Sequence, residues 1–564
     1  MADITVVPGE SPRTHSSDGS GWVHSYLENT GKHRGILAWI LSTDHKRIGI
    51  LYLISIFSFF AVGVILGFLM RLEMLVPGPA GKIFNAQEYN ALFTLHGVIM
   101  IFLFVIPGIP ATLGNFFLPI QIGAKDVAFP RLNLLSWYLY VTGAIVILLS
   151  LFWHGLPDTG WTFYVPYSIR TGTDVTVAVF GVFILGFSSI LTGLNFLTTI
   201  HRLRAPGMSF FRMPLFVWSL YATAWIQVIA TPVLAITLLL IIIERVFSVG
   251  IFNPTMGGDP VLYQHLFWIY SHPAVYIMIL PPMGVVSEIV ATFSHRTVFG
   301  YKMVAMSSLA IAFIGYLVWG HHMFVAGETQ TAQFVFSLLT FLVAVPSGIK
   351  VFNWIATMYK GSIDPQPPFL FLMAFIILFS IGGLTGLVLG SLATDVHLTG
   401  TYFVVGHFHY IIFGGAVFIF FGALHYWLPK MFGRMYNKKV SVWALGILFV
   451  GFNMLYFPML LLGYEGMPRR YFAYLPRYET LQHISMVGSW VLVLGLIIMF
   501  WNLLHGIFRG EKCGDNPWGG TTLEWTIPSP PPAENFEEIP VITHEPYYHP
   551  EAIETNPEPV AVAK

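Results

Sequence analysis

The sequence is poor in charge and in cysteine. Only 10% of its 564 residues are charged, whereas a soluble domain carries about 25%, so an ordinary soluble fold is excluded. The single cysteine, Cys513, excludes an internal disulfide and any multi-cysteine metal centre built by this chain alone. The formal net charge is zero, and composition therefore indicates no nucleic acid or other polyanion as a partner.

Long apolar runs are what the sequence has instead. Its mean hydropathy is +0.70, and runs of about 20 apolar residues, the length that spans a bilayer, recur along the chain. We predict an all-α membrane protein with a bundle of about twelve transmembrane helices. The predicted spans are 48–70, 91–118, 132–154, 176–200, 214–244, 261–293, 302–324, 333–358, 368–393, 402–428, 440–463 and 483–507.

The two ends of the chain differ in composition from its middle. Residues 1–40 form a polar N-terminal segment, residues 41–508 the transmembrane core, and residues 509–564 a tail rich in proline and glutamate. Such a composition cannot bury a core, so we expect the tail to be an extended strap or a disordered segment.

Basic residues gather in alternate loops between the predicted spans. By the positive-inside rule these loops face the cytoplasm, which predicts that both termini are cytoplasmic. The loop residues are Lys46, Arg47, Lys125, Arg131, Arg202, Arg204, Arg212, Arg296, Lys302, Lys360, Lys430, Arg434, Lys438 and Lys439.

Several histidines lie inside the apolar runs. An unpaired imidazole in lipid is costly, and imidazole is a common ligand of copper and iron, so the set predicts metal inside the bundle. Taken singly, a membrane histidine is more simply a hydrogen-bonding or interfacial residue, which is the expectation for His154, His425, His483 and His505 near span ends. The candidates for ligands are His96, His272, His321, His322, His407 and His409.

The six candidates are all expected in the outer half of the bilayer. Because a helix rises 1.5 Å per residue, a shared depth allows them to converge laterally. His407 and His409 are two positions apart, about 200° around a helix axis, so each would serve a different cofactor. His96, from another span, could supply the second ligand to one of these cofactors.

Three other imidazoles form a second group. His272, His321 and His322 would offer three nitrogens and an open position, which suits copper that reacts with a small molecule. Tyr276 follows His272 by one helical turn and shares its face. The adjacent pair beside Trp319 could instead be a cap at the end of a span.

Six sequence strings resemble subunit I of haem–copper cytochrome c oxidase. They run in the family's order and, with their surroundings, cover essentially all of residues 40–508. The strings are GNFFLPIQIGAKDVAFPRLN, WIYSHPAVY, WGHHMF, VPSGIKVFNWIATM, GTYFVVGHFHY and EGMPRRY.

The resemblance implies a role for each histidine. His96 and His409 correspond to the axial ligands of low-spin haem a, and His407 corresponds to the single ligand of high-spin haem a3. His272, His321 and His322 correspond to the ligands of the neighbouring copper. Tyr276 corresponds to the tyrosine that is joined to the first of these histidines and supplies an electron and a proton when the O–O bond breaks.

The resemblance also implies partners for the haem substituents. Arg469 and Arg470 correspond to the clamp on the haem propionates, which Trp161 joins, and Asp395 to a carboxylate near the haem a3 propionate. Arg71 corresponds to the arginine bonded to the haem a formyl group. Without the resemblance, an arginine pair in a loop would more simply be interfacial charge.

Two proton routes are expected. Lys350 is the one lysine clearly inside a predicted span, and an intramembrane ionisable group is a functional candidate by default, although a snorkelling lysine is the simpler alternative. It resembles the family's lysine channel, with Ser347 where a threonine is usual and Ser287 near the entrance. Asp126 resembles the mouth of the second channel, whose polar lining corresponds to Tyr52, Asn115, Asn133, Ser188, Ser189 and Asn195.

The sequence departs from the family at two places. Most relatives have a glutamate after the His-Pro pair, where this chain has Ala274, so we expect a relay of hydroxyls and water through Tyr270 and Ser271, a pair that marks a subgroup of the family. The family's His-Asp pair for magnesium aligns with Thr399 and Gly400, which offer no comparable ligands. The magnesium site is therefore expected to be absent or rebuilt by residues such as His397.

The predicted function is that of a terminal respiratory oxidase in a bacterial cytoplasmic membrane. It would reduce O2 to water with electrons from cytochrome c and pump protons, beside a subunit II with a dinuclear copper centre, a subunit III and other membrane subunits. A quinol oxidase would share this core. A nitric oxide reductase normally lacks the residues matching Tyr276 and Lys350, and a transporter or channel would leave the converging histidines unexplained.

Overall fold

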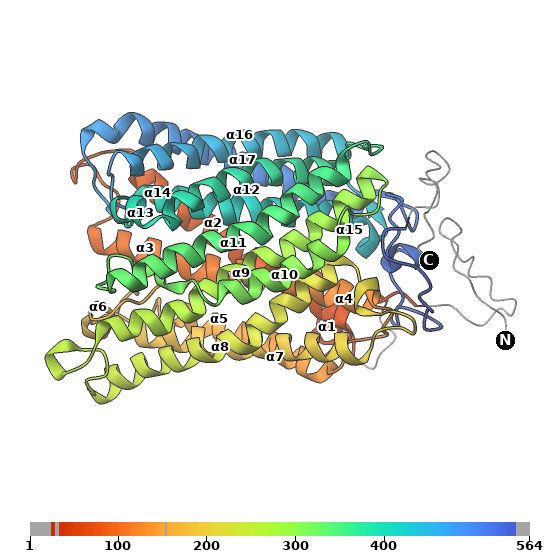
Figure 1. Cartoon of the computed structure of the whole chain (residues 1–564), viewed down its shortest axis with the longest axis horizontal. Coiled ribbons are helices and arrows are strands. Elements are labelled where there is room, and N and C mark those ends of the chain that lie inside the picture. Colours follow the sequence, from red (N-terminus) through yellow and green to blue (C-terminus); the bar gives the residue numbers. More distant parts are fainter. Residues whose placement is uncertain (1–23, 29–32, 153–154, 549–564) are drawn as a thin grey trace, which may run out of the picture.

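The computed structural model describes residues 24–28, 33–152 and 155–548, so His154 lies outside the described residues. Within them, 11 helical segments are long and apolar enough to cross a membrane, and they run side by side along the long axis of the molecule (Figure 1). The predicted all-α membrane fold is confirmed. The single-helix segments are α2 (His45–Glu73), α5 (Pro130–Leu149), α7 (Val175–Arg202), α8 (Leu215–Phe247), α9 (Pro260–Ser294), α11 (Gln330–Met358), α12 (Pro367–Gly390) and α16 (Lys438–Tyr464).

Three crossing segments are composite. The second consists of α3 (Ala86–Val98), η1 (Ile99–Val105), η2 (Pro110–Gly114) and α4 (Asn115–Gln121), the tenth of α14 (Tyr402–His409), η6 (Tyr410–Val417) and α15 (Phe418–Phe432), and the last of η7 (Pro476–Tyr478) and α17 (Glu479–Arg509). The segments η1, η2 and η6 are π-helical. Such segments inside α-helices are frequent at functional sites, and η6 begins immediately after His409.

The seventh predicted span is shorter than its apolar run. Its helix, α10 (Tyr301–Gly315), has 15 residues and is about 22 Å long, less than the roughly 30 Å of a hydrocarbon core. After Gly315 the chain turns into the 3-10 helix η5 (Trp319–Met323), which carries the adjacent histidine pair. The expectation that this pair ends a regular transmembrane helix is therefore wrong.

Short elements connect the crossing segments or follow them. Two strands pair in antiparallel fashion and join the end of α15 to the start of the tail, with Arg434 opposite Lys512. The remaining elements are α1 (Leu37–Ile40), α6 (Tyr167–Arg170), η3 (Phe210–Arg212), η4 (Pro254–Met256), α13 (Leu392–Leu398), β1 (Arg434–Met435), β2 (Glu511–Lys512) and η8 (Leu523–Thr526).

The described part of the tail packs against one end of the bundle. It lies at the end where α1 and α4 are found, on the right of Figure 1. Its aromatic side chains Trp518, Trp525 and Tyr547 are buried, and Tyr547 donates its hydroxyl to Glu288 of α9. The tail therefore runs as a strap that contributes side chains to the packed interior, which its overall composition did not indicate.

One histidine expected at an interface is buried instead. His425 is 0% exposed, its Nδ1 lies 2.7 Å from the Phe421 carbonyl oxygen, and its Nε2 lies 3.0 Å from Ser441 Oγ. The expectation failed because the segment after α15 folds back, with Tyr436 donating to the carbonyl of His425. His483 and His505 are exposed.

Candidate metal centre

One cavity of about 1000 Å³ is lined by all the candidate histidines. They arrive from four elements that are far apart in the chain, α3, α9, η5 and α14. A cavity of this size is at the upper end of the range for small-molecule and cofactor sites, about 300–1,000 Å³. The space and the ligand-bearing side chains therefore occur together.

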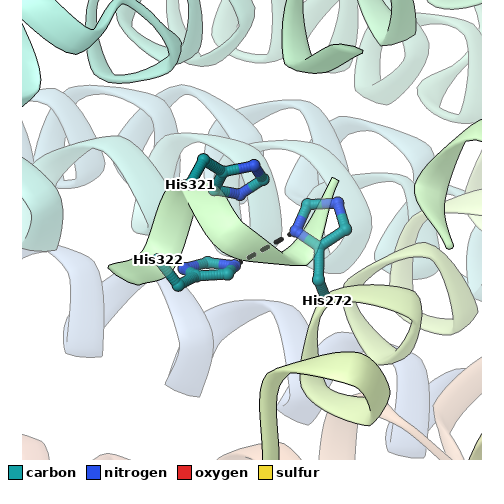
Figure 2. Close-up of side chains that lie close together, drawn as sticks. All are labelled: His272, His321 and His322. Atoms are coloured by element: carbon teal, nitrogen blue, oxygen red, sulfur yellow. Dashed lines mark hydrogen bonds between the residues drawn. The ribbon is translucent and has the colours of Figure 1, made fainter. Parts of the chain in front are cut away.

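His272, His321 and His322 form a compact group in this cavity. Their ligand nitrogens all lie within 4.8 Å of one another, and His272 Nδ1 is 3.1 Å from His322 Nε2 (Figure 2). Two nitrogens that bind one ion at about 2.0 Å lie roughly 3 Å apart. The group therefore fits a single metal ion with three imidazole ligands, a set that suits copper.

Neighbouring side chains fix the orientation of this group. The Trp268 ring stacks on the His322 ring with 3.8 Å between centroids, and His321 Nδ1 lies 2.9 Å from Thr340 Oγ1. The Tyr276 ring is 4.8 Å from the His272 ring, one turn further along α9. These contacts hold three rings at one point even though η5 is only a short 3-10 helix.

The other three histidines share one hydrogen-bond pattern. In each, Nδ1 faces a backbone carbonyl: Gly63 at 2.8 Å for His96, Gly382 at 3.1 Å for His407 and Val405 at 2.8 Å for His409. A carbonyl only accepts, so Nδ1 carries the proton and Nε2 keeps its lone pair. This is the arrangement found in metal-ligating histidines, whose second nitrogen is held by a partner outside the metal's own ligands.

The two histidines of α14 face different helices. His409 stacks on Tyr456 of α16 with 4.2 Å between ring centroids, whereas His407 contacts Gly382 and Thr385 of α12. Their spacing of two residues therefore sends the two imidazoles to different parts of the same cavity, as the helical geometry predicts.

Charged side chains line one part of the cavity. Arg469, Arg470, Trp161 and Asp395 all line it. Burial raises the pKa of Asp395 to about 7, although Arg469 acts in the opposite direction, and one carboxyl oxygen of Asp395 has no partner among the described residues. Burial and the neighbouring Arg469 lower the pKa of Arg470 to about 10. Two partly buried cations with few counter-charges suit an anionic ligand.

Arg71 also reaches the cavity but is held by protein groups. It donates to Ser485 Oγ and to Gln482 Oε1, both at 3.0 Å, and lies over the ring of Tyr402. It is 7% exposed. Its guanidinium is therefore fixed in place before any ligand binds.

Lys350 is buried inside the bundle and does not snorkel. Its Nζ donates to Ser308 Oγ at 2.8 Å and to the Val304 carbonyl at 3.1 Å, both on α10. Ser287 is also buried and accepts from Trp354 Nε1 at 2.9 Å, while Ser347 lines the large cavity. The sequence reasoning missed Ser308, although a serine pair at 307–308 in an apolar run was a usable signal.

Asp126 lies in the loop between α4 and α5. Burial raises its pKa to about 7. Asn195, expected in the polar lining, binds both backbone groups of Phe129 in this loop, at 2.9 and 3.2 Å. The buried Asn115 and Asn133 retain side-chain atoms that have no partner among the described residues.

Tyr270 faces a second, smaller cavity that Tyr52, Ser188 and Ser189 also line. Tyr52 donates to Ser136 at 3.0 Å and lies 3.1 Å from Ser188 Oγ. The hydroxyl of Ser271 is buried without a partner among the described residues. The structure thus brings Tyr270 close to residues of the second expected proton route.

The segment that aligns with the family's magnesium site is largely exposed to solvent. His397 and Gly400 are exposed, and the histidine trio is the one metal-ligand group found among the described residues. The magnesium expectation stays a prediction.

Comparisons with known proteins agree with this geometry. The family model for Cytochrome C and Quinol oxidase polypeptide I matches residues 47–497. Cytochrome c oxidase subunit 1 of Synechocystis sp. is 44% identical over 505 residues, covering 89% of this chain and 91% of the relative. The same subunit of Thermostichus vulcanus is 41% identical over 507 residues, covering 90% and 91%.

A solved structure gives the fold independently. A haem–copper terminal oxidase dimer determined by cryo-EM has a TM-score of 0.71 to this chain at 21% identity, covering 84% of this chain and 85% of the other. The agreement in fold and the match over most of the sequence lead to one conclusion. The chain is a multi-pass integral membrane protein that belongs to the family of cytochrome c and quinol oxidase polypeptide I.

Proposed function

We propose that this chain is the catalytic subunit of a terminal oxidase that reduces O2 to water with electrons from cytochrome c and couples the reaction to proton uptake and pumping. The observation that carries the proposal is the set of six histidines around one cavity, with three compact enough for one ion and three holding Nε2 free. The names of the relatives support the same reaction.

The histidines divide between two haems and one copper. His96 and His409 would hold haem a, His407 would hold haem a3, and the trio would hold copper. When bound, these groups would pass electrons from the donor to O2 and offer the coordination positions at which O2 is reduced. The carbonyls of Gly63, Val405 and Gly382 set the direction of each haem-binding ring.

The charged part of the cavity receives the haem carboxylates. Arg469 and Arg470 provide two partly buried cations for the propionates, and the Trp161 indole adds a donor. Asp395, whose pKa burial raises to about 7, accepts a hydrogen bond or holds a proton near them. Arg71, already fixed by Gln482 and Ser485, donates to the haem a formyl group.

Two routes bring protons to the site. Lys350, held by Ser308, passes protons toward Tyr276, with Ser287 near the entrance and Ser347 along the way. Asp126 takes up protons for the second route through Asn115, Asn133, Ser188, Ser189 and Asn195. Tyr270 and Ser271 end this route with hydroxyl groups, each of which accepts one proton and releases another.

The partners are a subunit II with a dinuclear copper centre, a subunit III, further membrane subunits and cytochrome c as donor. One cysteine in this chain cannot form that copper centre, so the donor-side metal must be on another chain. Membership of a family that includes quinol oxidases makes quinol the second candidate donor. We also propose that the loops rich in lysine and arginine, both termini and the tail face the cytoplasm.

A reduced-minus-oxidised spectrum with copper analysis of the purified complex tests the proposal. We expect haem a bands, with three copper ions per complex, one in this chain and two in subunit II. Haem bands with one copper ion would favour a quinol oxidase. A colourless complex would contradict the proposed function altogether.

A further inference from the structure

A small cavity lies where six crossing segments meet. It has a volume of about 30 Å³, and its lining comes from the second crossing segment and from α2, α5, α7, α8 and α9. Tyr52, Ser188, Ser189 and Tyr270 all line it. Gln227 of α8 also lines it and belongs to neither of the two proposed proton routes.

Gln227 is an unusual residue for its position. It lies within α8, a helix hydrophobic enough to cross the membrane, and is 2% exposed. Its side-chain oxygen Oε1 is buried without a hydrogen-bond partner among the described residues, and the same holds for Ser189 Oγ. A buried polar atom that makes no hydrogen bond costs about 1–3 kcal/mol, so native proteins satisfy such atoms with protein groups or ordered water.

The cavity has room for that water. One water molecule needs roughly 10–15 Å³ by the same measure and two to four polar partners, so about 30 Å³ accommodates roughly two. Gln227 offers one acceptor and two donors, and each serine hydroxyl offers both kinds of group. The wall therefore supplies enough partners for two molecules.

The packing of α7 against α8 fixes Gln227 in this place. A Cβ added to Gly193 of α7 would lie 3.0 Å from Gln227 Cβ and 3.0 Å from the Ala224 carbonyl oxygen. The close approach of the two helices at Gly193 thus sets the position from which the amide extends. Such rigid support is what a hydrogen-bonding site needs to hold water in one arrangement.

We propose that Gln227 and Ser189 bind a pair of ordered waters in this cavity and that these waters carry protons from the Tyr52–Ser188 cluster toward Tyr270. Each water accepts a proton at its oxygen and releases another from the same oxygen, so one proton moves and no group is oxidised or reduced. Gln227 keeps its own protons and is a positioning residue. This inference rests on the proposed oxidase function.

The test uses the complete oxidase complex. Gln227→Met removes the amide and keeps an unbranched side chain of similar length, and Gln227→Glu restores hydrogen-bonding oxygens. Thr237→Val is the matched control, because Thr237 is buried in the same helix but bonds only the Val233 carbonyl. Turnover, protons pumped per electron and a high-resolution map of the parent complex are measured.

We expect two water peaks beside Gln227 in the parent map. We also expect at least a roughly tenfold loss of proton-coupled turnover in Gln227→Met, recovery of most of that loss in Gln227→Glu, and no change in Thr237→Val. A dry cavity in the parent map overturns the inference, whatever the variants do. Turnover and pumping of Gln227→Met within twofold of the parent also overturn it, as does an equal loss in the Met and Glu variants. If the parent complex binds no haem or reduces no O2, the proposed function fails instead.

Discussion

Lys46 donates its ammonium group to the side-chain oxygen of Asn535 at 2.9 Å, although 489 positions separate the two residues. Both are buried. The Asn535 amide nitrogen donates in turn to the carbonyls of Ala124 and Lys125, at 2.9 and 3.1 Å. One tail residue therefore joins the start of α2 to the loop that carries Asp126.

Replacing Asn535 with glycine should release this loop. Asn535 has a φ of 61°, which glycine adopts without strain, so the variant removes the amide and keeps the backbone. Buried Lys46 loses an acceptor and two carbonyls lose a donor, each worth about 1–3 kcal/mol. We expect faster hydrogen–deuterium exchange across residues 122–127 and earlier thermal inactivation of the complex.

Glu534→Gln is the control for Asn535→Gly. Glu534 pairs with Lys125 at 3.2 Å, but both side chains are largely exposed, and such a pair contributes about 0–1 kcal/mol. We expect exchange of the loop to stay near the parent value in this control. Unchanged protection in Asn535→Gly would show that other contacts hold the loop.

Asp126 should give proton uptake a distinct pH dependence. Burial raises its pKa from 3.8 to about 7, so below about pH 7 the carboxyl holds a proton, and above it the group is ionised and must be reprotonated in each cycle. We expect turnover of the parent to fall as the pH rises through about 7. The turnover of Asp126→Asn should be lower at every pH and should lack this fall near pH 7, as measured by oxygen consumption between pH 5 and 9. A fall retained in Asp126→Asn would assign it to another group.

The raised pKa of Asp126 also makes the stability of the folded chain depend on pH. The unfolded chain loses the proton near pH 3.8, whereas the folded chain retains it to about pH 7, so folding binds a proton in this window. The contribution of this proton to the stability of the folded chain is complete below the pKa of the unfolded chain, 3.8, and is lost as the pH rises toward 7. Asp126→Asn should remove this part of the pH dependence of thermal inactivation.

Sequence reasoning reached the crossing helices because apolar length alone specifies them. The second and tenth spans kept their places even where π-helical segments interrupt them. The seventh predicted span is only partly α-helical. Hydropathy shows that a run is apolar, but it does not show which backbone conformation the run adopts. In the run 302–324 glycine is a local signal of the change, because α10 ends at Gly315 and glycine is frequent at helix C-termini, but hydropathy does not register it.

The candidate ligands could be named from the sequence because six polar rings at one depth are conspicuous in an apolar background. Their hydrogen-bond partners could not, since the carbonyls of Gly63 and Gly382 carry no side-chain signal. Composition also could not predict that the tail packs against the bundle. Residues 509–564 are rich in proline and glutamate, yet a few other residues, among them Trp525, Asn535 and Tyr547, are buried in the contact. Such contacts between distant segments exist only once the chain is folded.

Two glycines should discriminate between the proposed haem sites. A Cβ at Gly67 would lie 3.0 Å from His96 Cε1, and a Cβ at Gly386 would lie 3.0 Å from His407 Cε1. We expect Gly67→Ala to tilt His96 and alter only the low-spin haem band, and Gly386→Ala to tilt His407 and alter only the high-spin band and its binding of carbon monoxide. Each variant is the control for the other, and copper content should not change. Identical spectral changes in both variants would contradict the assignment.

Ser308 should set the efficiency of the lysine route. Its hydroxyl is one of two acceptors for Lys350 Nζ, at 2.8 Å, and a hydrogen bond to a charged group contributes about 1.5–3 kcal/mol. Ser308→Ala should therefore slow electron entry into the oxygen-reducing site by roughly tenfold or more, and Lys350→Met by about 100-fold, in stopped-flow reduction. The adjacent Ser307 is the control, because it is buried in the same helix but bonds only the Val304 carbonyl. If Ser307→Ala slows reduction as much as Ser308→Ala, the effect comes from the packing of α10, and the bond from Ser308 to Lys350 has no part in it.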